Sequence, residues 1–244
     1  MIKVIIMITK LIVAATIALF LNSCNIKTDF GEEGNGTITT NARIINENFK
    51  GIDVGAGIEV TVKQANNQFV SVETDSNLQS LIETKVVDGV LVIKPTQSVD
   101  PTSTIKVVVK MAYVESLDAS SGSEIVGMGA FKGENIVIHA SSAAEIDVNV
   151  RYDNVNLDAS SGANITAKGV GLKLETNASS GSEINAFDLL VNDIVADASS
   201  GSNTNVHPIL KLSATASSGS NIMYNNKPKS ISKDQSSGGN IDLE

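Results

Sequence analysis

The chain has 244 residues, of which 42% are hydrophobic and only 4% aromatic, and it carries a net charge of −9 at neutral pH. Such a length fits one large domain or two small ones, and an acidic chain offers no basic surface for phosphates, so we expect no nucleic-acid partner. The hydrophobic residues are mainly Val, Ile, Leu and Ala, and tryptophan is absent, which favours thin, regular β-layers over a bulky core.

The first 23 residues have the features of a secretory signal peptide. Lys3 and Lys10 supply positive charge, and the apolar run over residues 11–21 is shorter than the roughly 20 residues of a membrane span. The following LNSC, residues 21–24, resembles a bacterial lipobox, in which the cysteine becomes the lipidated first residue. We therefore predict a lipoprotein signal peptide over residues 1–23 and lipidation of Cys24, the only cysteine. The alternative is an ordinary signal peptide that contains a cysteine by coincidence.

Removing residues 1–23 leaves 16 basic and 27 acidic side chains, a net charge of −11. Residues 24–36 are polar and contain several glycines, which predicts a flexible tether between the lipid and the folded domain. A lipid anchor makes the membrane a partner and predicts a place in the cell envelope, at the outer membrane. Whether the domain faces the periplasm or the outside stays open.

A short motif repeats along the second half of the chain. Ala-Ser-Ser-Gly begins at residues 119, 159, 178, 198 and 216, and the variants ASSA and QSSG begin at residues 140 and 235. The successive offsets are 21, 19, 19, 20, 18 and 19 residues, a period too short for paired-helix repeats. The repeat therefore predicts a stack of short structural units over residues 116–244.

Each unit has the alternation of a half-buried strand on both sides of the motif. Leu172, Leu174 and Ala178 alternate with polar residues before one copy, and isoleucine recurs three residues after the glycine position, with Thr204 as the exception. One thin unit cannot bury a core, so the units must stack about 4.8 Å apart with isoleucine on isoleucine. We predict an all-β fold, a parallel β-solenoid. Its corners would need alanine and glycine because larger side chains would collide with their copies in neighbouring coils.

The first half, residues 37–115, is expected to be a less regular version of the same solenoid. Val54-Gly55-Ala56-Gly57 aligns with Ala-Ser-Ser-Gly, residues 69–73, 90–93 and 105–110 have strand patterns, and residues 76–82 suggest a helical turn. Only the short loop over residues 95–101 separates the two halves. One continuous domain over residues 37–244 is therefore predicted.

Residues 42–94, which begin ARIINENFKGIDVGAGIEV, resemble the opening of the family of putative auto-transporter adhesins with a head GIN domain. The later G-[SA]-[EN]-I copies, YNNKPKSI at residues 224–231 and SGGNI at residues 237–241 are similar to its closing part. The resemblance covers residues 37–244. It implies a single-stranded right-handed parallel β-helix in secreted or lipid-anchored proteins, mostly of Bacteroidetes, and it brings no known active site.

Two polar rows follow from the register of the repeat. One row precedes each alanine of the motif, and the other follows each glycine position by two residues; both should point outward. The rows consist of Asp118, His139, Asp158, Asn177, Asp197, Thr215 and Asp234, and of Glu124, Glu145, Asn164, Glu183, Asn203, Asn221 and Asn240. They are either a solvated surface that caps the corners or a ligand face for a glycan, for calcium or for a host or envelope protein.

No residue set predicts catalysis, a metal site or a cofactor. Asp158 and Asp197 should lie two coils apart, about 10 Å, and are too alike to serve as one acid and one base. The two histidines, His139 and His207, are far apart in the repeat, and serines recur in every coil, so a Ser-His-Asp triad lacks parts. Few aromatic residues also weigh against tight sugar binding. We predict a non-catalytic adhesin or surface binding module, with a self-associating envelope scaffold as the alternative and a glycan-degrading enzyme as a more distant one.

Overall fold

The fold is that of a computed structural model, which describes residues 31–244. The predicted signal peptide, Cys24 and most of the predicted tether lie outside the described residues. Residues 32–244 form one compact unit. In the part of the chain described, no helix is long and apolar enough to cross a membrane.

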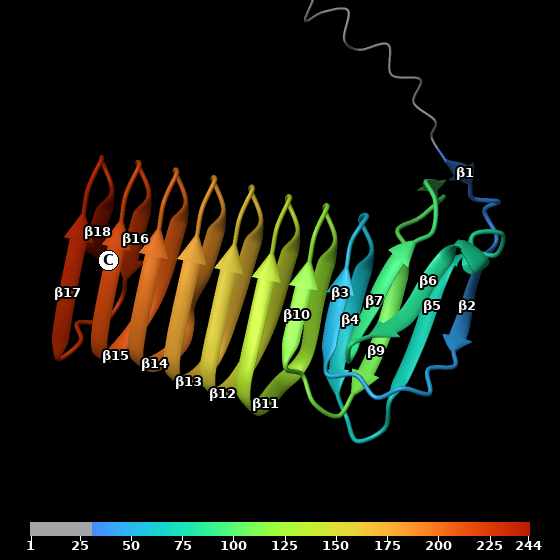
Figure 1. The fold of residues 1–244 in the computed structure, drawn as a ribbon, viewed down its shortest axis with the longest axis horizontal. Coiled ribbons are helices and arrows are strands. Elements are labelled where there is room, and N and C mark those ends of the chain that lie inside the picture. Colours follow the sequence, from blue (N-terminus) through green and yellow to red (C-terminus); the bar gives the residue numbers. More distant parts are fainter. Residues whose placement is uncertain (1–30) are drawn as a thin grey trace, which may run out of the picture. The chain divides into compact units, whose positions relative to one another are not determined.

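The regular half is a stack of parallel coils, which confirms the predicted β-solenoid (Figure 1). Neighbouring coils pair in register, so that Ile146 lies beside Ile165 and Asp158 beside Asn177. The strands are β10 (Ser116–Ala119), β11 (Glu124–Ala140), β12 (Glu145–Ala159), β13 (Asn164–Ala178), β14 (Glu183–Ala198), β15 (Asn203–Ala216), β16 (Asn221–Tyr224), β17 (Ser230–Gln235) and β18 (Asn240–Leu243).

Each long strand contributes to two faces of the stack. The start of β15 pairs with β16 and its end pairs with β17, just as the start of β11 pairs with β4 and its end with β10. We call the side with β10 and β17 face A and the side with β16 and β18 face B. The faces meet at the serine corners on one edge and, on the other, at the middle of the long strands, which we call the wide corner (Figure 1).

The serine corners are tight turns with two left-handed residues. Ser121 has a φ of 53° and Gly122 a φ of 70°, and the amide of Ser123 donates to the carbonyl of Ser120 at 3.2 Å. This is the type I′ turn, which needs positive φ at both central positions. The same pair of angles recurs in all seven copies, including Ser142 and Ala143 of the ASSA variant.

The predicted reason for glycine at the corners was wrong. A Cβ added to Gly122, Gly162 or Gly181 would meet no atom within 4 Å, so crowding between coils does not select glycine there. Glycine is favoured because it adopts positive φ without the strain of a side chain. The corners therefore leave open space at the outer edge of the stack.

The predicted isoleucine column is confirmed as the inner core of face B. Its members, from Ile125 to Ile241, are at most 1% exposed, and Thr204 occupies the same column at 0%. Leu174 and Ala178 are buried as expected, but Leu172 is 51% exposed. The inward alternation does not extend to Leu172 because the strand bends there, between Gly171 and Lys173, where the pairing with both neighbouring coils is interrupted.

We expect Thr204→Val to stabilise the protein by about 1 kcal/mol, because the buried Thr204 hydroxyl has no hydrogen-bond partner in the described chain. Valine keeps the shape and removes the unpaired group. The change should raise the melting temperature by about 2–4 °C in circular dichroism. Thr215→Val, at an exposed outward position, is the matched control and should leave it unchanged; an equal rise in both would contradict the assignment.

The first half departs from the prediction of parallel coils alone. Its elements are β1 (Glu32–Glu33), β2 (Ile38–Arg43), β3 (Gly51–Val54), β4 (Glu59–Gln64), β5 (Phe69–Asp75), the 3-10 helix η2 (Gln79–Leu81), β6 (Ile82–Val87), β7 (Val90–Pro95), β8 (Val99–Asp100) and β9 (Lys106–Met111). Strand β3 continues the stack in register, with Val54 beside Ala119 as aligned. However, β6 pairs antiparallel with β7, and β5 pairs antiparallel with both β9 and β2. These strands complete the sheet edges that a purely parallel array would leave open at this end.

The predicted tether ends earlier than Gly36. Strand β1 pairs with β8, and the amide of Gly34 donates to the carbonyl of Asp100 at 2.8 Å. The amide of Gly36 donates to Oδ1 of the buried Asp75 at 2.7 Å, and Asp75 also accepts from the amide and hydroxyl of Thr102 at 2.9 and 2.8 Å. Residues 32–36 are therefore part of the folded unit, because their backbone bonds to β8 and to the carboxylate of Asp75.

We expect Asp75→Asn to loosen residues 32–36. The side-chain NH2 group of asparagine cannot accept the hydrogen bonds that the Asp75 carboxylate receives from Gly36 and Thr102. Burial alone would raise the pKa of Asp75, but the hydrogen bonds from Thr102 and Gly36 outweigh it and hold the pKa below its ordinary 3.8. This stabilisation is present above that pH and is lost as the pH falls through the folded value. Hydrogen exchange of residues 32–36 should be faster in the variant at pH 6, and the two proteins should converge only when the pH falls below the lowered pKa of Asp75. Asp100→Asn, an exposed carboxylate, is the control; unchanged exchange in Asp75→Asn would refute the role.

Candidate functional site

The first predicted polar row lies on face A and continues beyond the regular repeat. Asp53, Asp118, His139 and Asp158 occupy four successive coils, and Asn177 and Asp197 follow. The His139 Nδ1 lies 3.5 Å from Asp158 Oδ1. Burial raises the pKa of Asp118, His139 opposes this effect, and Asp53 and Asp158 add to it. Histidine between two aspartates therefore relieves the repulsion along the row.

The second predicted row lies on face B and also extends into the first half. Glu59 lies beside Glu124, and Glu145, Asn164 and Glu183 follow in register. Burial raises the pKa of Glu124, and the neighbouring Glu59 and Glu145 raise it further. Both predicted rows thus point outward, but they lie on opposite faces and form no single site.

At four of the corners, the serine that follows the glycine makes the shortest side-chain hydrogen bonds to the backbone, rather than the Ser-Ser pair. Ser182, which follows the glycine, is fully buried; its Oγ donates to the carbonyl of Ala159 in the preceding coil at 2.8 Å and accepts from the amide of Ser179 at 3.1 Å. Ser123, Ser202 and Ser220 make equivalent bonds. In the sequence these residues are recognisable as the last serine of SSGS. Their side chains join neighbouring coils.

A shallow hollow of about 280 Å³ follows the first row along four coils. It is lined by Asp158, Asn177, Asp197 and Thr215 on one side and by Ser179, Ser199 and Ser217 on the other. Each coil therefore adds at least one carboxylate, amide or hydroxyl group to the lining. Its members repeat nearly alike, so it offers hydrogen bonds to a repeating ligand and no unique reactive group.

The two polar rows present carboxylates, amides and hydroxyls that can form hydrogen bonds with a ligand. Among residues 31–244, no group of three or more His, Cys, Asp or Glu side chains is placed to hold a metal ion. Asp158 and Asp197 lie two coils apart, and His207 pairs with Leu190 at the wide corner, whereas His139 lies on face A.

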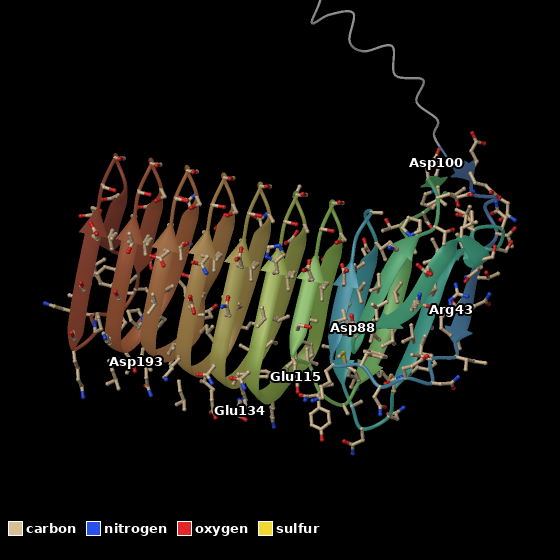
Figure 2. All side chains as sticks on the ribbon, viewed as in Figure 1. Arg43, Asp88, Asp100, Glu115, Glu134 and Asp193 are labelled. Atoms are coloured by element: carbon tan, nitrogen blue, oxygen red, sulfur yellow. The ribbon has the colours of Figure 1, made fainter. Side chains whose placement is uncertain are left out.

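A larger hollow, of about 570 Å³, lies where the regular array meets the first half. It is lined by Gln64, Tyr113, Val114, Glu115, Lys132, Gly133, Glu134, Asn135 and Tyr152. Figure 2 shows Glu115 and Glu134 near one another on the same edge of the stack. Sequence reasoning missed this site because it lies where the repeat is interrupted, between β9 and β10.

The floor of this junction hollow is rigid. Gln64 donates through Nε2 to the carbonyls of Ala112 and Lys132 at 3.0 Å and accepts from the amide of Lys132 at 2.8 Å. The hydroxyl of Tyr152 donates to the carbonyl of Val114 at 2.6 Å, and burial followed by the nearby Glu115 raises the pKa of Tyr152 to about 12. Tyr152 therefore stays neutral and holds the hollow together.

The rim of the junction hollow carries an exposed aromatic ring. Tyr113 is 62% exposed, and the Nζ of Lys50 lies 5.5 Å from the centre of its ring. Lys50 also donates to Glu115 Oε1 at 2.8 Å, and this hydrogen bond and charge raise the pKa of the lysine. The ring, a cation and a carboxylate are thus held side by side.

The comparisons with known proteins agree with the fold. The family model of the putative auto-transporter adhesin, head GIN domain matches residues 48–228. The chain belongs to this family. No curated protein matches it.

Several solved structures are similar to this head GIN protein. A putative adhesin from Bacteroides fragilis has a TM-score of 0.82 at 15% identity and covers 88% of this chain and 100% of its own. A putative lipid binding protein from Parabacteroides distasonis and a putative adhesin from Parabacteroides merdae each have a TM-score of 0.73 at 20% identity, covering 87% of this chain and 98% of their own. At these identities the likeness establishes the fold, a β-solenoid, and the family places the protein among adhesin-like envelope proteins.

Proposed function

We propose that this head GIN protein is a non-catalytic binding module of the bacterial cell envelope and that its ligand is a glycan held in the junction hollow. The observation that carries the proposal is Tyr113, an exposed ring fixed beside polar groups on the rim of a hollow of about 570 Å³. Binding sites for small ligands have this size and combine an apolar surface with a few placed polar groups. The scarcity of aromatic residues leaves Tyr113 as the natural platform for a sugar ring.

The polar groups around Tyr113 suit hydroxyl-rich ligands. Glu115 and Glu134 accept hydrogen bonds, while Lys50 and Lys132 donate them. The floor formed by Gln64 and Tyr152 needs no rearrangement on binding, which lowers the entropy cost of association. Family membership supports binding rather than catalysis.

The test is a glycan array with the full-length protein, followed by titration of each glycan that binds. We expect Tyr113→Ala to weaken binding at least about tenfold, the loss of about 1.4 kcal/mol of contact with one aromatic ring. Phe69→Ala is the matched control, because Phe69 is an exposed ring with Lys110 Nζ at 5.4 Å outside the hollow. Binding that survives Tyr113→Ala but is lost in Asp158→Asn with Asp197→Asn would move the site to face A. Cleavage of a bound glycan would overturn the non-catalytic proposal.

We also propose that Cys24 carries a lipid that anchors this module at the outer membrane. The lipobox-like LNSC sequence after a short apolar run supports it. Incorporation of labelled palmitate into the wild-type protein and its absence from Cys24→Ser is the expected result. Labelling that persists in Cys24→Ser would refute it.

A further inference from the structure

The charges of the regular array are divided between its two edges. Residues 116–244 contain eight basic residues, and seven of them lie along the wide corner or in the turn that replaces it in the last coil; Lys233 is the exception. The seven are Lys132, Arg151, Lys168, Lys173, Lys211, Lys227 and Lys229, and all are exposed. Glu134, Asp153, Asp188 and Asp193 lie among them, and Asp147 pairs with Lys168, its Oδ1 3.3 Å from the lysine Nζ; the other 10 acidic residues of this region lie elsewhere. A chain with a strongly acidic total thus has one basic edge.

The same edge exposes aliphatic side chains. Val170 is 46% exposed, Leu172 51%, Leu190 42% and Ile209 36%. Val170 pairs with Leu190 across neighbouring coils, and Arg151 pairs with Val170 on the other side, so basic and apolar residues are interleaved. We call these aliphatic and basic residues the wide-corner ridge. Figure 2 shows this edge from the side, with Glu134 and Asp193 labelled on it, opposite the serine corners.

We propose that the wide-corner ridge docks the folded domain onto an anionic lipid bilayer. Exposed aliphatic side chains enter the interfacial region of a membrane, and neighbouring lysines and arginines bind its anionic headgroups, each contributing to affinity. The acidic rows near the serine corners are repelled by the same surface, so the charge division also sets the orientation. The ridge and the junction hollow share Lys132, but the ridge centres on β13–β15, and the variants that test it leave every residue of the hollow unchanged.

The absence of tryptophan gives a direct test in the full-length protein. Leu172→Trp places a single fluorescent reporter on the ridge, and Glu183→Trp places one at an exposed position of face B as the matched control. Each variant is reconstituted into vesicles of phosphatidylcholine with one quarter phosphatidylglycerol, and into vesicles of phosphatidylcholine alone. Lipids brominated in their acyl chains quench a tryptophan that enters the bilayer.

We expect blue-shifted, quenched emission from Leu172→Trp in the anionic vesicles and neither change from Glu183→Trp. Adding Arg151→Glu with Lys173→Glu should weaken docking by at least about fivefold for each basic residue replaced, because each change removes a positive charge and adds a negative one. Lys85→Glu with Lys94→Glu, on β6 and β7, is the control for total charge and should change nothing. An unaltered melting temperature shows that each variant is folded. Equal quenching at positions 172 and 183, or quenching that is the same in neutral vesicles, would overturn the proposal; no quenching in any vesicle would also overturn it and would favour a protein partner for the ridge.

Discussion

Gly169→Ala should destabilise the protein by about 3 kcal/mol or more, a loss of about 10 °C in melting temperature. Gly169 lies in β13 with a φ of 122°, a conformation that side chains rarely adopt, and an added Cβ would overlap the carbonyl oxygen of Val150. That carbonyl belongs to the neighbouring coil, so the overlap cannot be relieved by rotating a side chain. The stack itself would have to separate at this position.

Gly162→Ala is the matched control for this prediction. Gly162 also has positive φ, 72°, but an added Cβ would meet nothing within 4 Å, and Ala143 adopts a φ of 61° at the equivalent corner. Its expected cost is about 1 kcal/mol, the strain of a left-handed alanine. Thermal unfolding followed by circular dichroism checks both variants. Equal losses would show that backbone strain alone, and not contact between coils, sets the cost at Gly169.

Lys233→Leu should strengthen association through the C-terminal end about 10- to 100-fold, the effect of burying a leucine there. Lys233 pairs with Ala214 in an inward column, yet it carries a charge. Its Nζ donates to the carbonyl of Ile241 at 2.7 Å and lies 4.8 Å from the ring of Tyr224, so the side chain crosses the end of the last coil. An inward charge on an edge strand is a known protection against further strand addition.

The expected result bears on the alternative of a self-associating scaffold. We expect the wild-type protein to remain monomeric through this end and Lys233→Leu to show a mass that rises with concentration in sedimentation equilibrium. Lys229→Leu makes the same change of charge in the exposed turn before β17 and should leave the mass unchanged. A wild-type protein that assembles as readily as Lys233→Leu would favour the scaffold instead.

The repeat made the regular half predictable from sequence. Once the copies of Ala-Ser-Ser-Gly were aligned, the period fixed the register, and the register fixed which residues point inward, as the buried Ile146 and Ile165 show. The alternation failed only where the strand bends, at Leu172. The reason for the corner glycines was not predictable from sequence. A positive φ and crowding between coils both favour glycine, and only the structure shows that the positive φ is the cause.

The candidate site was much less predictable than the fold. The two polar rows were found because they repeat, but Gln64, Tyr113 and Glu134 come from segments that do not repeat, and their meeting depends on how the antiparallel strands join the stack. Likewise, the hydrogen bond between Asp75 and Gly36 joins residues 39 positions apart, and no sequence motif or repeat predicts this contact. The predicted tether therefore ran five residues too far.

Because the coils stack in register, the array can change in length by whole coils. Deleting residues 160–178 would join Ala159 to Ser179, remove one whole unit and restore the SSG corner. Each such change alters the distance between the two ends by about 4.8 Å and leaves both ends intact. A lineage that duplicates or loses units can thus change the length of the stack while the strands that close its two ends stay the same.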